Sequence, residues 1–223
     1  MKKITLLLSA MAVMAASVHA QVNFAPELGL NLSNYSFKEG SFSINSGMRA
    51  GLRVGGMTDI RLTDNLYLQP GLLYVMNGFK WSFDFIGQPN TIKASVSTIE
   101  IPVNLLYKAG KPGKGRLFVG GGPYIAYNIG GNIKSTVDGI TTSEKMKIGN
   151  DSTCLLKPLD IGIGINIGYE FTENFYARLH SQYGFTNLLP ISSQTNANIN
   201  SYNFGLSFGY IFVKKTKKEA KKK

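Results

Sequence analysis

The sequence has very few residues of the kinds that build disulfide, metal or cofactor sites. Its 223 residues include one cysteine, Cys154, so no disulfide can form within the chain. It has two histidines, and no spacing of histidine, cysteine and carboxylate is typical of a metal site. A phosphate-binding loop and a dinucleotide fingerprint are also absent. We therefore expect no metal and no cofactor, and we interpret Cys154 as an ordinary thiol.

Long apolar runs are also missing. After residue 20, no run reaches the roughly 18 apolar residues that a membrane-spanning helix needs. Residues 1–20 combine two lysines, an apolar stretch at 4–16 and a plausible cleavage site at 18–20 (Val-His-Ala), which predicts a cleaved secretory signal peptide. The stretch is too short for the alternative, a spanning helix, and the predicted cleavage site has no cysteine for a lipoprotein anchor. We expect export and a mature chain that begins at Gln21.

Acidic residues are scarce, with 13 against 24 lysines and arginines and a formal net charge of +11. The imbalance is local, because residues 214–223 hold seven lysines and one glutamate. The rest of the mature chain is close to balanced, so we expect no nucleic-acid partner. Mean hydropathy near zero and 25 glycines are typical of membrane barrel strands rather than of a helical membrane protein.

Residues 160–185 have the clearest hydrophobic pattern, a period of two that indicates extended strands. One phase is apolar, the other is small or polar, and the pattern resumes after a turn at 172–174. The polar phase includes Glu170, Arg178 and His180. Such a face is a poor core for a soluble protein, because burying an unpaired charge is costly. A barrel that turns its apolar phase to lipid and its polar phase to the lumen removes this conflict.

Eight segments with this period follow the predicted signal peptide. The segments are 22–35, 47–62, 66–83, 94–108, 116–129, 160–171, 175–185 and 201–213. Long and short connections alternate between them, and the long ones are 36–46, 84–93, 130–157 and 186–200. This alternation, with aromatic residues near strand ends, is typical of outer-membrane barrels that have long loops outside and tight turns in the periplasm.

We therefore predict one all-β domain at 21–213, an eight-stranded antiparallel up-and-down transmembrane β-barrel in the outer membrane. Both termini would lie on the periplasmic side, and residues 137–140 would form a hairpin turn within the third long connection. A soluble lipocalin-like, ligand-binding barrel is the alternative, since it also has eight strands. Such a barrel would bury the apolar phase in its interior, expose the polar phase to water, and stay in solution without detergent. The aromatic bands and the signal peptide favour the membrane barrel.

The last segment carries a local sorting pattern. Asn203 and Gly205 are followed by aromatic residues two apart, Phe208 and Tyr210. This resembles the C-terminal recognition signal of outer-membrane barrels, although the chain continues past Phe212. We expect the barrel assembly machinery to be a partner and this strand to pair with the first one. The alternative is an ordinary hydrophobic last strand.

Charged residues of the inward phase form a candidate site. We expect Glu27, Arg49, Arg53, Glu100 and Arg178 to meet in the lumen, because an eight-stranded barrel is just wide enough for side chains. Paired in this way, they would fill the lumen in a structural role. The alternative is a proton-sensitive or ion-sensitive gate, which measurable conductance would support.

A catalytic histidine is the second candidate. His180 is the only histidine after the predicted cleavage site, and Ser181 is adjacent to it. Neighbouring strand residues point to opposite faces, so these two cannot form a dyad. A lipid-modifying outer-membrane enzyme would need another serine and an acid to converge on His180. We predict a protein without catalytic residues.

Basic residues gather on the predicted periplasmic side. Lys108, Lys111, Lys114 and Arg116 flank one tight turn, and the tail at 214–223 leaves the barrel there. We expect these residues to face anionic lipid or the cell wall; the alternative is a solvated tail. The tail lysines closest to the barrel are Lys214, Lys215, Lys217 and Lys218.

Three segments, 68–74 (LQPGLLY), 99–107 (IEIPVNLLY) and 119–124 (VGGGPY), resemble the PorT-like family of small outer-membrane barrels. That family is similar in form to the OmpA and OmpX barrels, and its namesake is tied to a system that exports surface proteins. The resemblance implies a barrel surrounded by outer-membrane lipid, with no catalytic residues to carry over. With exposed loops on a rigid scaffold, we expect a role in surface interaction or adhesion, in envelope integrity, or as an accessory to protein export with export components as partners.

Overall fold

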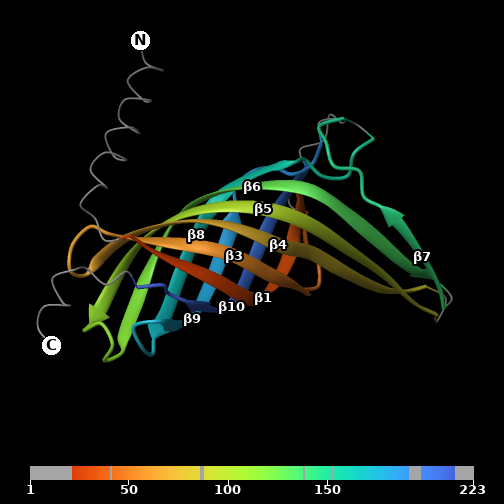
Figure 1. Cartoon of the computed structure of the whole chain (residues 1–223). Helices are drawn as coiled ribbons and strands as arrows, with labels where there is room; N and C mark the ends of the chain where they lie inside the picture. Colours follow the sequence, from red (N-terminus) through yellow and green to blue (C-terminus); the bar gives the residue numbers. More distant parts are fainter. Residues whose placement is uncertain are drawn as a thin grey trace, which may run out of the picture.

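The computed structural model describes residues 22–40, 42–85, 88–137, 139–151, 153–190 and 197–213. Within these ranges the chain is built mainly from antiparallel strands (Figure 1). The predicted signal peptide at 1–20 and the lysine tail at 214–223 lie outside the described residues. The strands are β1 (Val22–Glu39), β2 (Phe42–Asn45), β3 (Arg49–Arg61), β4 (Leu66–Phe85), β5 (Gln88–Gly110), β6 (Arg116–Val137), β7 (Ile140–Lys145), β8 (Leu159–Glu170), β9 (Phe175–Gly184) and β10 (Ala197–Tyr210).

Eight of these strands form a closed ring. Hydrogen bonding follows the order β10-β9-β8-β6-β5-β4-β3-β1, and β10 also pairs with β1. β2 pairs with the end of β1, and β7 pairs with the end of β6. A closed ring satisfies the backbone groups that an open edge would expose to lipid. The predicted eight-stranded antiparallel up-and-down barrel is confirmed, including the pairing of the first and last strands.

The apolar phase of the strands faces outward. Ile161, Ile163, Ile165 and Ile167 of β8 are between 42% and 66% exposed, whereas Arg178 of β9 is 1% exposed. This is the arrangement of a membrane barrel, with lipid-facing and lumen-facing residues alternating along each strand. The soluble lipocalin-like alternative is therefore wrong. The described residues include no helix with the length and apolar character to cross a membrane.

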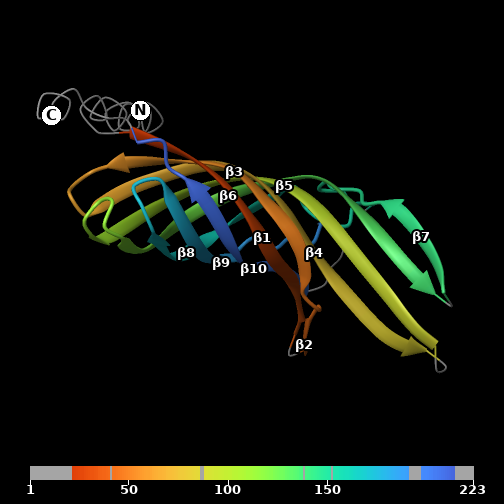
Figure 2. The same cartoon turned by 60° about the horizontal axis from the view of Figure 1, so that its bottom comes forward.

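The two ends of the barrel differ. Tight turns at 62–65, 111–115 and 171–174 lie at the same end as the first and last described residues (Figures 1 and 2). We call this the turn end. Here a bridge between Phe24 and Phe212 continues the β1–β10 seam past the last strand. The other end, which we call the loop end, carries the longer connections.

Much of the loop end is strand. β4 continues to Phe85 and β5 begins at Gln88, so the predicted polar connection at 84–93 is wrong. The predicted connection at 36–46 likewise contains the end of β1 and all of β2. Both corrections have the same cause, because the backbone ladder continues past the end of the apolar phase, as far as Phe85 and Gln88 in β4 and β5 and as far as Glu39 and Phe42 in β1 and β2. The predicted hairpin turn at 137–140 is confirmed, since Val137 pairs with Ile140.

Three strands extend well beyond the membrane. β4, β5 and β6 contain 20, 23 and 22 residues, while a barrel strand needs about 9–11 residues to cross a bilayer. Their outer parts, 78–85, 88–95 and 132–137, pair with one another and with β7. We call this four-stranded extension the protruding sheet; it projects from one side of the loop end (Figure 2).

Candidate functional site

Four buried charges meet inside the barrel, and we call them the central group: Glu27, Arg53, Glu100 and Arg178. Arg53 Nη2 lies 3.1 Å from Glu100 Oε1, and Arg53 Nε lies 3.6 Å from Glu27 Oε1. Arg178 Nε lies 3.6 Å from Glu27 Oε2, which also accepts a hydrogen bond of 2.8 Å from the Tyr176 hydroxyl. All four residues are at most 2% exposed. Two positive and two negative charges balance one another, as buried charges require.

A second cluster, the turn-end group, contains Asp59, Lys108, Arg116 and Glu170. The Lys108 ammonium group is ion-paired with Asp59 and lies 2.6 Å from Glu170 Oε1. Arg116 Nη2 lies 2.6 Å from Glu170 Oε2, and Arg116 Nη1 donates to the Tyr67 hydroxyl at 3.1 Å. All four charged residues are at most 8% exposed. This group is also balanced, with two charges of each sign.

Gln69 joins the two groups into one lumen network. Its Nε2 donates to Asp59 Oδ1 at 2.5 Å, and its Oε1 accepts from Arg178 Nη2 at 2.5 Å. The rings of Phe118 and Tyr176 flank the same guanidinium, 5.5 and 5.4 Å from its central carbon, a cation–π arrangement. Side chains thus occupy the interior from the turn end to the central group.

Glycines on the lumen side make room for these rings. A Cβ at position 168 would lie 2.2 Å from the Phe118 ring, and a Cβ at position 209 would lie 2.1 Å from the Tyr176 ring. Any larger residue at Gly168 or Gly209 would have to displace a ring from the lumen. The glycines of β8 and β10 therefore determine where the bulky interior side chains fit.

Arg49 does not join the central group, contrary to our prediction. It is the first residue of β3, and its guanidinium reaches over Gly78 to β5. There Nη1 donates to the Ala94 carbonyl at 2.5 Å and to the Ser95 hydroxyl. Arg49 lies nearer the loop end than the central group, because it is the first residue of β3. Gly78 of β4 has no side chain to block the Arg49 side chain, which therefore reaches β5.

Two of the predicted turn-end cations also differ from expectation. Lys108 is 1% exposed and Arg116 is 8% exposed, so both are lumen residues rather than a surface for anionic lipid. Their acidic partners inside the barrel explain this placement. Lys111 and Lys114 are exposed as predicted, whereas the tail residues Lys214, Lys215, Lys217 and Lys218 lie outside the described residues.

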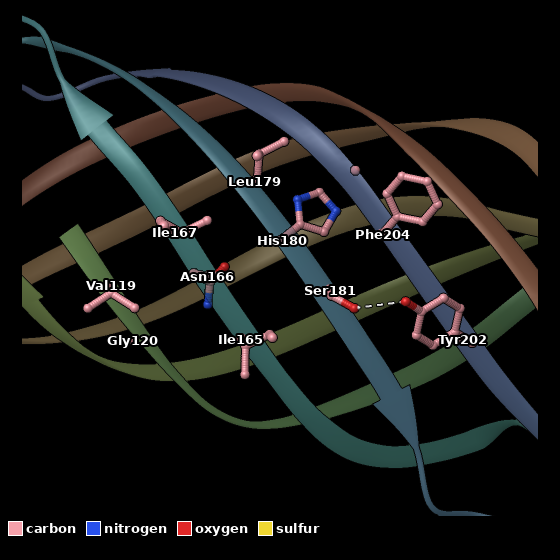
Figure 3. A pocket seen from close by; sticks show the side chains of 11 residues that line it. Val119, Gly120, Ile165, Asn166, Ile167, Leu179, His180, Ser181, Tyr202 and Phe204 are labelled. Atoms are coloured by element: carbon pink, nitrogen blue, oxygen red, sulfur yellow. Dashed lines mark hydrogen bonds between the residues drawn. The ribbon is translucent and has the colours of Figure 1, made fainter. Parts of the chain in front are cut away.

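The arrangement around His180 does not resemble a hydrolase site. His180 is 4% exposed, and neither ring nitrogen has a hydrogen-bond partner among the described residues. Ser181 points away from it and donates to the Tyr202 hydroxyl at 3.3 Å (Figure 3). His180, Ser181 and Tyr202 line a groove of about 920 Å³ over β6, β8, β9 and β10. The exposed isoleucines and Phe204 along it belong to the lipid-facing wall.

The protruding sheet carries a row of three lysines. Lys80 of β4 pairs in register with Lys93 of β5, which pairs with Lys134 of β6. Residues directly opposite in an antiparallel sheet point to the same face, and all three are exposed. None of the ion pairs among the described residues includes them. Arg49 contacts Ser95, two residues from Lys93, so it adds a fourth cation beside the row, and we call these four residues the basic face.

A metal site does not emerge from the described ranges, which hold no cluster of three or more histidine, cysteine, aspartate and glutamate side chains. Cys154 is a partly exposed free thiol in the connection between β7 and β8. The predicted sorting residues lie in β10, where Asn203 pairs with Ser33 and Phe208 with Leu28 of β1.

Several lumen residues were not predicted. Asp59, Gln69, Lys108, Arg116 and Tyr176 all belong to the lumen network. Their strand phase could have identified them, because Lys108 shares the parity of Glu100 along β5, and Asp59 shares that of Arg53 along β3. Lys108 was instead predicted at the end of its strand beside the turn, as a cation facing anionic lipid, whereas β5 continues to Gly110.

The sequence matches the family described as "Outer membrane protein beta-barrel domain" over residues 15–190. No curated protein matches the chain at a significant level. Among solved structures, OprG from Pseudomonas aeruginosa is similar at 11% identity and a TM-score of 0.46, with 87% of this chain and 97% of that chain covered. Ail of Yersinia pestis is similar at 11% identity and a TM-score of 0.42, with 86% and 99% covered.

The TM-scores are below 0.5, so the family assignment depends on the sequence match. That match covers most of the chain, and it agrees with the closed ring and the outward apolar face. The chain therefore belongs to the outer membrane protein beta-barrel domain family, and its location is the outer membrane.

Proposed function

We propose that this protein is a non-catalytic, non-conducting barrel that binds an anionic polymer outside the cell through its basic face. The observation that carries the proposal is the register of Lys80, Lys93 and Lys134 across three neighbouring strands. Like charges directly opposite in a sheet are destabilising, so the row costs stability unless an anion offsets it. A row of cations at strand spacing suits a chain of sulfate, phosphate or carboxylate groups.

The position of the basic face supports an external partner. Lys93 lies six residues along β5 from Ile99, whose strand phase faces lipid. Six residues span roughly 20 Å of strand, so the lysines stand beyond the apolar belt even when the strand is tilted. In the orientation usual for outer-membrane barrels, long connections face outward and tight turns face the periplasm. We infer that the basic face is exposed at the cell surface.

The lumen network argues against transport as the main role. Its buried ion pairs fill the interior of an eight-stranded ring, which leaves little more room than its side chains need. A barrel blocked in this way acts as a scaffold, and its function then depends on what the loop end presents. We interpret the central and turn-end groups as structural.

The test is retention on immobilised heparin at low salt, with heparin as a sulfated polymer probe. We compare the triple variant Lys80→Gln, Lys93→Gln, Lys134→Gln with a matched control, Arg61→Gln, Lys111→Gln, Lys114→Gln, which removes three charges at the turn end. Both variants keep the tail at 214–223, so its charge drops out of the comparison. We expect the basic-face variant to bind at least tenfold more weakly and the control to bind like the native protein.

If heparin binding weakens equally in both variants, then net charge alone explains the retention, and the proposal is contradicted. A second arm repeats the assay in vesicles with and without lipopolysaccharide. If lipopolysaccharide abolishes the difference between native and variant protein, then the basic face is occupied by the cell's own membrane rather than by an external polymer.

A narrower role, as a PorT-like accessory to protein export, remains a sequence-based proposal. Its three motifs fall in β4, β5 and β6, which are neighbours in the ring. Deleting the gene and measuring the surface export of other proteins would separate this role from polymer binding. Loss of export with unchanged heparin binding of cells would favour the export role.

A further inference from the structure

The mouth of the barrel contains an apolar pocket at the loop end. Its volume is about 280 Å³, and its walls come from β1, β4, β6, β10 and the connections that follow β2, β7 and β9. None of the described residues that line it is charged. This mouth pocket is separate from the basic face, because inward residues of the same strands line it.

An aromatic wall forms one side of the mouth pocket. The rings of Tyr35 and Phe79 are 5.8 Å apart at 81°, and those of Phe79 and Trp81 are 6.2 Å apart at 77°. Aliphatic side chains, including Ile133 and Leu156, complete the lining. Trp81 is 40% exposed, which leaves the pocket open to solvent. Edge-to-face aromatic geometry favours a further ring placed against the wall.

The pocket has few polar groups, and one of them, the Ser46 hydroxyl, can donate a hydrogen bond to a ligand. Ser46 Oγ accepts a hydrogen bond of 3.0 Å from the Tyr35 amide. This fixes the oxygen and leaves the hydroxyl proton available to an acceptor in the pocket. Small-molecule sites commonly combine an apolar lining with a small number of polar groups that orient the ligand.

We propose that the mouth pocket binds a small neutral molecule of one or two rings with a single hydrogen-bond acceptor. The volume lies just below the roughly 300–1,000 Å³ of ordinary small-molecule sites, which limits the ligand to this size. A charged ligand would lose hydration without gaining a partner, since the lining is uncharged. The ring packs against the wall formed by Tyr35, Phe79 and Trp81, and its acceptor meets the Ser46 hydroxyl.

The chain's single tryptophan gives a direct assay, because Trp81 lines the pocket. The probe is 4-bromobenzyl alcohol, whose bromine quenches indole fluorescence on contact. The purified full chain in lipid nanodiscs is titrated with the probe, and so are two variants. Ile133→Phe fills the pocket, whereas Ile140→Phe places the same side chain on β7, outside it. We expect saturable quenching in the native protein and in Ile140→Phe, and at least tenfold weaker binding in Ile133→Phe.

Competition keeps the test independent of whether a variant folds. Excess benzyl alcohol, which lacks bromine, must restore the emission of the native protein along a saturating curve. The Ser46→Ala variant should lose affinity for 4-bromobenzyl alcohol while its affinity for 4-bromotoluene stays unchanged. Quenching that is linear in probe concentration and unaffected by benzyl alcohol reports partitioning into lipid and overturns the proposal.

Discussion

At the scale of single residues, the structure depends on charges that are buried in pairs. Arg178 touches Glu27, Gln69 and two aromatic rings while it is 1% exposed. Removing one member of a buried pair leaves the other without compensation, which usually costs more than removing both. The stability of the barrel therefore depends on Arg178 and Glu27 being present together.

The first prediction is a double-mutant cycle on this pair. Arg178→Met and Glu27→Gln should each lower the free energy of unfolding by about 3–5 kcal/mol. The double variant should lose less than the sum of the two, because no lone charge remains. Urea unfolding in lipid vesicles, followed by the heat-dependent shift in gel mobility, measures these values. Strict additivity would show that the two groups do not interact.

The second prediction contrasts two lysines three residues apart. Lys108→Met should lower the free energy of unfolding by about 3–5 kcal/mol, because it leaves Asp59 and Glu170 short of a cation in the lumen. Lys111→Met, in the exposed turn, should change it by less than about 0.5 kcal/mol. The same unfolding assay compares them. Similar values for both variants would contradict the burial of Lys108.

At the scale of strands, alternation predicted the barrel well but predicted strand ends poorly. The phase of Ile161, Ile163, Ile165 and Ile167 separated the two faces, and the aromatic bands with the predicted signal peptide assigned the apolar face to lipid. The segment 84–93 was taken for a loop because it is polar, yet strand pairing continues through it. Outside the membrane, water satisfies both faces of a strand, so the apolar phase disappears while the hydrogen-bonded ladder remains.

The candidate site was predictable only in part, for a related reason. Phase places Glu27, Arg53, Glu100 and Arg178 on the lumen side, but it gives no height along the barrel. Arg49 shares that phase and lies beyond the lumen charges. Register between strands decides which side chains meet, and register depends on irregularities such as the shift at Ser97 and Thr98, which the hydrophobic pattern does not show.

The third prediction concerns the β4–β5 hairpin. Replacing residues 82–91 by an Asn-Gly turn should leave the unfolding free energy of the barrel nearly unchanged, because this tip lies outside the closed ring. Heparin binding should persist, since Lys80 and Lys93 remain paired. A barrel that no longer folds in vesicles would show that the tip takes part in assembly.

At the scale of the whole molecule, the filled lumen should prevent ion flow. Purified native protein in a planar bilayer is expected to show no step conductance at neutral pH, because the lumen network occupies the interior. A porin added to the same bilayer provides the positive control. Discrete, reproducible steps from the pure protein would instead support the ion-sensitive gate.

The fifth prediction concerns which end of the barrel faces the cell exterior, and the single cysteine makes this orientation measurable. Cys154 lies at the loop end and is partly exposed, so a large maleimide–polyethylene glycol should label it on intact cells. A variant with Cys154→Ser and Lys111→Cys moves the thiol to the turn end. We expect that variant to react only after the outer membrane is permeabilised. The reverse pattern would place the basic face in the periplasm.

The ion pair between Glu27 and Arg178 has a consequence for how the barrel is built. Glu27 belongs to β1 and its partners Arg178 and Tyr176 belong to β9, with β10 between them. These contacts can form only after β10 has joined β1. In an open sheet Glu27 could still contact Arg53 of the neighbouring β3, but the Arg178 guanidinium would lack its carboxylate partner. Sealing of the ring and neutralisation of Arg178 are then a single cooperative event, and partly built intermediates gain none of the stabilisation from this pair.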